Sequence, residues 1–100
     1  MVVDATNVYW IDRTNGLIQR MGKDGGSPVT LAKDQWSANQ LALDDEYVYW
    51  QVGERIFRVR KGGGTPVLWA KGDFTVGGLA VDAHHVFWLE NDGAVRALAK

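Results

Sequence analysis

Three short stretches of this chain, Val8-Tyr9-Trp10, Val48-Tyr49-Trp50 and Val86-Phe87-Trp88, share one pattern of a valine, an aromatic residue and a tryptophan. The tryptophans stand 40 and then 38 residues apart. Self-similarity at a period of about 40 residues is typical of repeat architectures, in which each copy is one supersecondary unit. The sequence therefore predicts three tandem copies of one unit.

The pattern extends to both sides of these stretches. An aspartate precedes each tryptophan by six residues, and a lysine follows it by 11 to 13 residues. The aspartates are Asp4, Asp44 and Asp82, and the lysines are Lys23, Lys61 and Lys100. The segments of variable length are predicted to be exposed turns, where a change of length is tolerated. The 100 residues form a single fragment, with copies at about 1–40, 41–78 and 79–100.

Each copy is predicted to consist of short strands without helices. Its apolar runs are rich in Val, Ile, Leu and aromatic residues and are bounded by Gly, Asp, Asn or Pro. No segment keeps apolar residues at helical spacing long enough for a helix. The predicted strands are 2–4, 8–11, 17–21 and 29–32 in the first copy, 41–44, 47–51, 55–59 and 67–70 in the second, and 79–82, 86–89 and 94–98 in the third. The third copy thus has no fourth strand.

The second strand of each copy is apolar on both faces, because successive side chains of a strand point to opposite sides. A sheet that is covered on both faces is what a middle blade of a β-propeller provides. The sequence therefore predicts an all-β fold of four-stranded antiparallel blades, about three per chain. The expected core between the blades is Val8, Tyr9, Trp10, Val48, Tyr49, Trp50, Val86, Phe87 and Trp88. Each of the three aspartates is expected to accept a hydrogen bond from the backbone two residues further on.

The assembled pattern resembles the YWTD-type propeller, the class B repeat of low-density-lipoprotein-receptor-like proteins. Val8-Tyr9-Trp10-Ile11-Asp12 carries the resemblance most fully, whereas Val52 and Glu90 stand where the family signature has its aspartate. The segments 25–29 and 63–67, Gly-Gly-Ser/Thr-Pro-Val, resemble bacterial propeller repeats of unknown function. The resemblance implies a ring of blades, with six in YWTD-type propellers and other numbers in related bacterial ones.

Three blades alone would expose two apolar faces, one at each end, and monomers rarely expose apolar patches beyond a few hundred Å². We therefore expect self-association into a ring, and two chains of three blades would give six. The alternative is that the sequence is an excised or engineered piece of a longer propeller.

A ligand would be expected at the mouth of the propeller channel, in the loops that lead from one blade to the next. The candidate residues are Gln35, Trp36, Asn39, Gln40, Asp73 and Phe74. An aromatic ring among amides and carboxylates can stack on a sugar, a peptide or a small molecule while the polar groups orient it. In the alternative interpretation the aromatic residues fill space between blades and the polar ones only solvate a loop.

The remaining chemistry is sparse. A net charge of −1 argues against nucleic acid as a partner, and no apolar run is long enough to span a membrane. No signal peptide is visible, and the compartment stays open. With no cysteine there is no thiolate chemistry, and His84-His85 is expected in a surface turn. No catalytic residue, metal site or cofactor is predicted, although a metal-dependent, lactonase-like hydrolase and a glycan-binding, lectin-like module remain alternatives to a binding scaffold.

Overall fold

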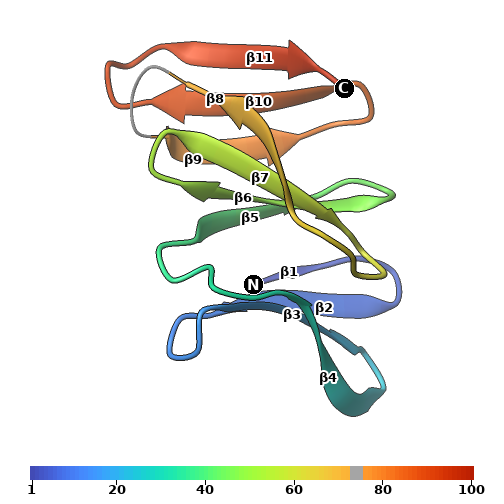
Figure 1. The fold of residues 1–100 in the computed structure, drawn as a ribbon. Coiled ribbons are helices and arrows are strands. Elements are labelled where there is room, and N and C mark those ends of the chain that lie inside the picture. Colours follow the sequence, from blue (N-terminus) through green and yellow to red (C-terminus); the bar gives the residue numbers. More distant parts are fainter. Residues whose placement is uncertain (73–75) are drawn as a thin grey trace.

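The computed structural model of the protein describes residues 1–72 and 76–100, which form three antiparallel sheets and no helix. Figure 1 shows the sheets stacked one above another, in chain order from bottom to top. The first sheet holds β1 (Val2–Val3), β2 (Asn7–Asp12), β3 (Leu17–Gly22) and β4 (Gly25–Ala32). The second holds β5 (Asn39–Leu43), β6 (Tyr47–Val52), β7 (Arg55–Arg60) and β8 (Val67–Lys71). The third holds β9 (Val76–Val81), β10 (His85–Glu90) and β11 (Val95–Ala99).

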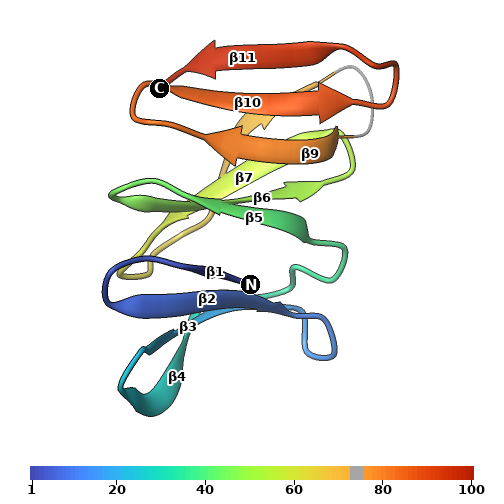
Figure 2. The same ribbon diagram turned by 180° about the vertical axis from the view of Figure 1, so that it is seen from behind.

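These strands confirm the predicted all-β class and the four-, four- and three-stranded pattern of the copies. Within each sheet the strands are neighbours in chain order, so every connection inside a sheet is a hairpin. The strands β1, β5 and β9 lead the three sheets, and β5 contacts both β1 and β9 (Figure 2). The sheets therefore stack as propeller blades do, with their first strands side by side.

The largest difference from the sequence prediction lies in β4, which begins at Gly25 instead of Val29. The segment before Val29 was expected to be a hairpin turn. Gly25 and Gly26 have φ values of 102° and 103°, a region that glycine enters without steric cost. Because of this freedom, Gly25 pairs with Gly22 and the ladder continues to the tip of the hairpin.

Two apolar cores lie between the sheets. The first contains Tyr9 and Ile18 of the first sheet, which pack with Val48 and Trp50 of the second. The second contains Tyr49 and Ile56 of the second sheet, with Val86 and Trp88 of the third. In each core the tyrosine comes from one sheet and the valine and tryptophan from the next, because these residues alternate along one strand. The same three-residue pattern thus supplies both sides of the stack.

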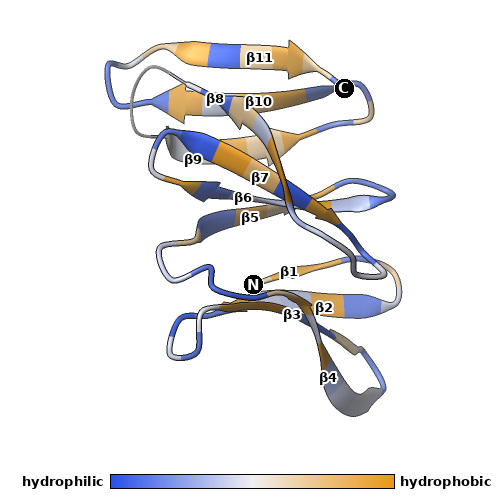
Figure 3. Cartoon of the chain, in the orientation of Figure 1, coloured by the Kyte–Doolittle hydropathy of each residue, from blue (hydrophilic) through white to orange (hydrophobic). Residues whose placement is uncertain are grey.

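The two ends of the stack are open. Val8 and Trp10 on the first sheet, and Phe87 on the third, are half-buried, whereas Tyr9, Tyr49 and Trp50 are fully buried. Figure 3 shows hydrophobic segments on β1 and β2 at one end of the stack and on β10 and β11 at the other. The half-buried residues are those members of the pattern that have no neighbouring sheet to cover them.

Candidate functional site

An ion pair recurs between neighbouring sheets, at the ends where the first strand of each sheet turns into the second. The Lys61 ammonium of the second sheet lies 2.9 Å from Oδ2 of Asp4 in the first. The Lys100 ammonium, beyond the end of β11, lies 2.9 Å from Oδ2 of Asp44 in the second. We call this contact the inter-blade ion pair. It joins an aspartate of one blade to a lysine of the blade that follows.

Backbone hydrogen bonds place each of these lysines. The amide of Lys61 donates to the carbonyl of Glu46, at 2.9 Å, and that of Lys100 donates to the carbonyl of His84, at 3.0 Å. These carbonyls lie in the turn between the first two strands of the lysine's own sheet. The lysine is therefore anchored beside its own turn while its side chain reaches the turn of the preceding sheet.

Each aspartate divides its two oxygens between two tasks. Oδ1 of Asp4 accepts from the amides of Thr6 and Asn7, at 3.0 and 2.8 Å, which confirms the predicted Asp turn. Oδ2 accepts from the hydroxyl of Tyr9, at 2.8 Å, and from Lys61. Asp44 repeats the arrangement, with the hydroxyl of Tyr49 donating to Oδ2 at 2.7 Å. The turn is thus tied to the core tyrosine of its own blade and to the lysine of the next.

The electrostatics of the inter-blade ion pair favour the charged carboxylate. Burial by itself would raise the pKa of Asp44, but hydrogen bonds from Tyr49, Lys100 and two turn amides outweigh burial and lower the pKa to about 2. At Asp4, too, burial would raise the pKa, but the hydrogen bonds that the carboxylate accepts outweigh burial and hold the pKa well below its ordinary value. Burial, followed by the bond to the carboxylate, raises the pKa of Tyr9 and of Tyr49 to about 12. Both carboxylates are therefore ionised, and both tyrosines protonated, at neutral pH.

The third aspartate and the first lysine have the same local geometry. Oδ1 of Asp82 accepts from the amides of His84 and His85, at 2.8 and 2.7 Å, and these bonds lower the pKa of Asp82. The amide of Lys23 donates to the carbonyl of Thr6, at 2.9 Å, as the other two lysines do at their own turns. Within residues 1–72 and 76–100, the Lys23 side chain forms no ion pair, and Asp82 approaches only the ring of His85, at 3.9 Å. The side chain of Asp82 is 55% exposed, against 23% for Asp4 and 12% for Asp44.

A cavity of about 480 Å³ lies next to the second inter-blade ion pair, between the second and third sheets. Asp44, Lys100, Arg58 and Asp82 line it, with Tyr47 on the side of β6. The Arg58 guanidinium lies 4.0 Å from the centre of the Tyr47 ring. The repeated lysine and aspartate positions were visible in the sequence, but their meeting across sheets was not predicted, because only the stacking brings them together.

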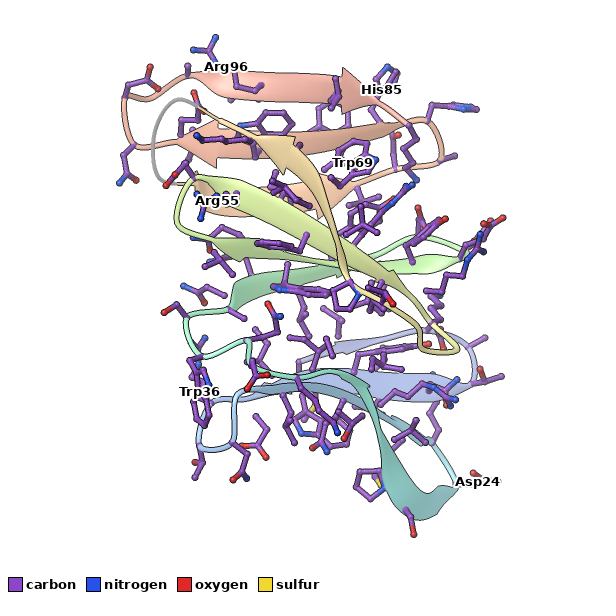
Figure 4. All side chains as sticks on the ribbon, viewed as in Figure 1. Asp24, Trp36, Arg55, Trp69, His85 and Arg96 are labelled. Carbon is purple, nitrogen blue, oxygen red and sulfur yellow. The ribbon has the colours of Figure 1, made fainter. Side chains whose placement is uncertain are left out.

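Gln35 and Trp36, two of the residues predicted to bind a ligand, lie in the β4–β5 loop, at the opposite end of the strands. Gln35 supports the core, because its Oε1 accepts from the indole N–H of Trp50, at 2.9 Å. Trp36 is 59% exposed (Figure 4), and a Cβ built on Gly16 would come within 2.7 Å of its ring. The carbonyl oxygen of the Asn39 side chain accepts from Arg13, at 2.9 Å.

The other four predicted ligand-binding residues include two strand residues and two that the structure does not describe. Asn39 and Gln40 are the first residues of β5 and do not belong to the loop, and Gln40 has a φ of 58°. Asp73 and Phe74 lie outside the described residues. Trp36 in the β4–β5 loop, Arg13 in the β2–β3 turn and Asn39 at the start of β5 are thus exposed aromatic and polar residues at this end of the first two sheets.

Residues 1–72 and 76–100 contain no group of three or more His, Asp or Glu side chains that could hold a metal ion. They also contain no helix with the length and apolar character to cross a membrane.

Comparison with known proteins agrees with the fold. No protein-family model and no curated protein sequence matches this chain. Among solved structures, the chain is similar to one chain of the crystal structure of a nidogen/laminin complex, with a TM-score of 0.76 and 20% sequence identity. The similarity covers 94% of this chain and 39% of that one. At this identity the similarity concerns the fold alone, and it agrees with the propeller-like stacking of the sheets. The present chain therefore spans about two fifths of the length of the chain that it matches.

The inter-blade ion pair predicts a specific acid sensitivity. Because the folded-state pKa of Asp44 is below its ordinary value of 3.8, the stability that it contributes is present above about pH 4 and is lost as the pH falls through about 2. Asp44→Asn should lose on the order of 2 kcal/mol of unfolding free energy at pH 7 and show a flatter decline in acid. Urea unfolding at several pH values measures both effects. The exposed neighbour Asp45 provides the control, since Asp45→Asn should follow the wild type, and parallel curves for Asp44→Asn would contradict the assignment.

The packing of Trp36 on Gly16 makes a second prediction. Gly16 and Gly53 lie in equivalent hairpin turns with φ values of 68° and 59°, but nothing lies within 4 Å of a Cβ on Gly53. Gly53→Ala should cost only the strain of the left-handed backbone, about 1 kcal/mol. Gly16→Ala should cost about 1–3 kcal/mol more, because the Trp36 ring must move. The excess should disappear in a Trp36→Ala background, as measured by urea unfolding, and equal costs in both backgrounds would show that the ring does not rest on the turn.

Proposed function

We propose that this chain is an interaction scaffold that contributes three blades to a closed β-propeller, and that its two end faces bind further blades. The observation that carries the proposal is the burial of equivalent residues. Trp50 and Trp88, each preceded by a sheet, are 0% and 7% exposed, and Tyr9 and Tyr49, each followed by a sheet, are 0% exposed. Their counterparts at the ends, Trp10 and Phe87, are only half-buried.

Further apolar side chains lie next to these two residues. Val3 pairs with Val8 on the first sheet and is 58% exposed. On the third sheet Leu89 pairs with Val95, and these side chains are 44% and 70% exposed. Covering apolar surface is worth about 25 cal/mol per Å², so that two faces of this kind could contribute as much as the net stability of a small domain.

The partner that we favour is a second copy of the chain. Two copies of three blades make six, the number that the resemblance to YWTD-type propellers implies. In such a two-fold ring the first sheet of each copy meets the third sheet of the other, so that both open faces are covered by the same contact. Blades from elsewhere in a longer protein would cover the faces by the same chemistry.

The mass of the native particle tests this proposal. Sedimentation equilibrium should give twice the 11.1 kDa of one chain. Trp10→Asp, which places a charge on an end face, should shift the particle to a single chain, because an unpaired charge is costly to bury. The control is Leu68→Asp on β8, a half-exposed residue away from the end sheets, which should leave the mass unchanged. A wild-type chain that sediments at 11.1 kDa and unfolds cooperatively would overturn the dimer.

The exposed Trp36 supports a second candidate function, the binding of a sugar or peptide at the loop end of the blades. Its indole is held against Gly16, and Asn39 and Arg13 provide polar groups nearby. A ring held in place in this way can stack on a ligand at little cost in side-chain entropy. A panel of glycans and peptides should give a binder whose affinity falls at least tenfold in Trp36→Ala and is largely kept in Trp36→Phe. Equal binding by both variants would exclude Trp36 from the site.

A further inference from the structure

We propose that Lys23 of one chain and Asp82 of a second copy form a third inter-blade ion pair, and that this contact sets the orientation and register in which the two copies dock. The inference rests on the proposed function, because it names the residues that select the partner of the end faces. Asp4–Lys61 and Asp44–Lys100 join each described neighbouring pair of sheets at 2.9 Å. Asp82 and Lys23 are the two remaining members of the series.

Both residues already make the local hydrogen bonds that accompany the existing ion pairs. The Lys23 amide is bonded to the Thr6 carbonyl as the amides of Lys61 and Lys100 are bonded at their own turns. Oδ1 of Asp82 is occupied by two turn amides, as Oδ1 is in Asp4 and Asp44. Oδ2 is the oxygen that binds lysine in both existing pairs, and it has no hydrogen-bond donor among residues 1–72 and 76–100.

The apolar residues beside Asp82 and beside Lys23 match the two halves of an existing core between sheets. In the first core, Tyr9 and the paired residues Ile11 and Ile18 receive Val48 and Trp50 of the next sheet. On the open face of the third sheet, Phe87 and the paired residues Leu89 and Val95 occupy the corresponding positions.

The opposite face repeats the other half of that core. On the open face of the first sheet, Val3, Val8 and Trp10 correspond to Leu43, Val48 and Trp50. A copy docked with Lys23 on Asp82 would therefore bring apolar against apolar surface in the register of the existing cores.

One difference between the copies of the repeat makes this third contact depend more strongly on the lysine. The tyrosine hydroxyl that shares Oδ2 in the first two pairs is absent in the third, because Phe87 stands in its place. The His85 ring lies on the other side of the carboxylate, with Nδ1 3.9 Å from Oδ1. Lys23 of a second copy would then be the main partner of Oδ2, and the face would favour a blade that carries a lysine at this position. The contact thus provides specificity beyond the non-directional attraction of the apolar faces.

A charge exchange tests the contact. In Lys23→Glu the two interfaces of the dimer each place glutamate against Asp82, and in Asp82→Lys they each place lysine against Lys23. Each variant alone should dimerise about tenfold more weakly than the wild type. An equimolar mixture should form a heterodimer of near wild-type affinity, since both of its interfaces then pair opposite charges. Lys71→Glu, at the exposed last residue of β8 in the middle blade, carries the same change of charge and should neither weaken the dimer nor restore the affinity of Asp82→Lys when the two are mixed.

Asp82→Lys also removes the acceptor of the His84 and His85 amides, so far-UV circular dichroism and thermal unfolding check that it folds. A second pair, Lys23→Met and Asp82→Asn, keeps an acceptor in the turn. Here each single variant should weaken the dimer about threefold to tenfold, and the double variant should be no weaker than the weaker single one.

The outcomes separate the two proposals. A wild-type chain that stays monomeric overturns both. A wild-type dimer that is indifferent to Lys23→Glu and Lys23→Met, or single variants that the mixture does not rescue, would overturn the ion pair while leaving self-association intact.

Discussion

The constraint on which the rest of the structure depends is that the central strand of each sheet is apolar on both faces. Such a strand cannot leave either side in water without exposing a large aromatic residue, so each sheet must be covered by another sheet above and below. Tyr9 and Tyr49 are covered by the sheet that follows, and Trp50 and Trp88 by the sheet that precedes. The stack of blades, the open faces at its ends and the expectation of a partner all follow from this one requirement.

Apolar contact alone would allow sheets to slide or rotate over one another, since the attraction has no preferred direction. The inter-blade ion pairs supply direction. On one side of each pair is a turn that Asp4 or Asp44 holds together through hydrogen bonds from its own amides. On the other side is a lysine whose backbone amide is hydrogen-bonded to its own sheet. The two charges therefore meet only in one register of the sheets. The tyrosine hydroxyl couples the same carboxylate to the apolar core. The register of neighbouring blades and the burial of the core tyrosine therefore depend on the same carboxylate, at one end of each blade.

Much of the fold was predictable, because it rests on local and periodic signals. The eleven strands, their hairpins and the Asp turns were all expected from the repeat, and only β4, β5 and β9 begin notably earlier than predicted. The start of β4 was missed because Gly25, at a positive φ, pairs with Gly22 in the ladder, where glycine usually indicates a turn. The candidate site was less predictable. Gln35 resembled a ligand-binding amide in the sequence, but in the structure its oxygen accepts from Trp50 fifteen residues away.

The sequence by itself determined the number of repeats, the strands of each blade and the residues that must be covered, since all of these depend on spacing along the chain. Tertiary structure alone decided which aspartate meets which lysine. Asp4 and Lys61 are 57 residues apart, and their own copies contain nearer partners of opposite charge. They meet because the stacking of one sheet on the next places the lysine of each blade beside the aspartate of the preceding blade. This proximity is a property of the stacked sheets and is absent from any single copy of the repeat.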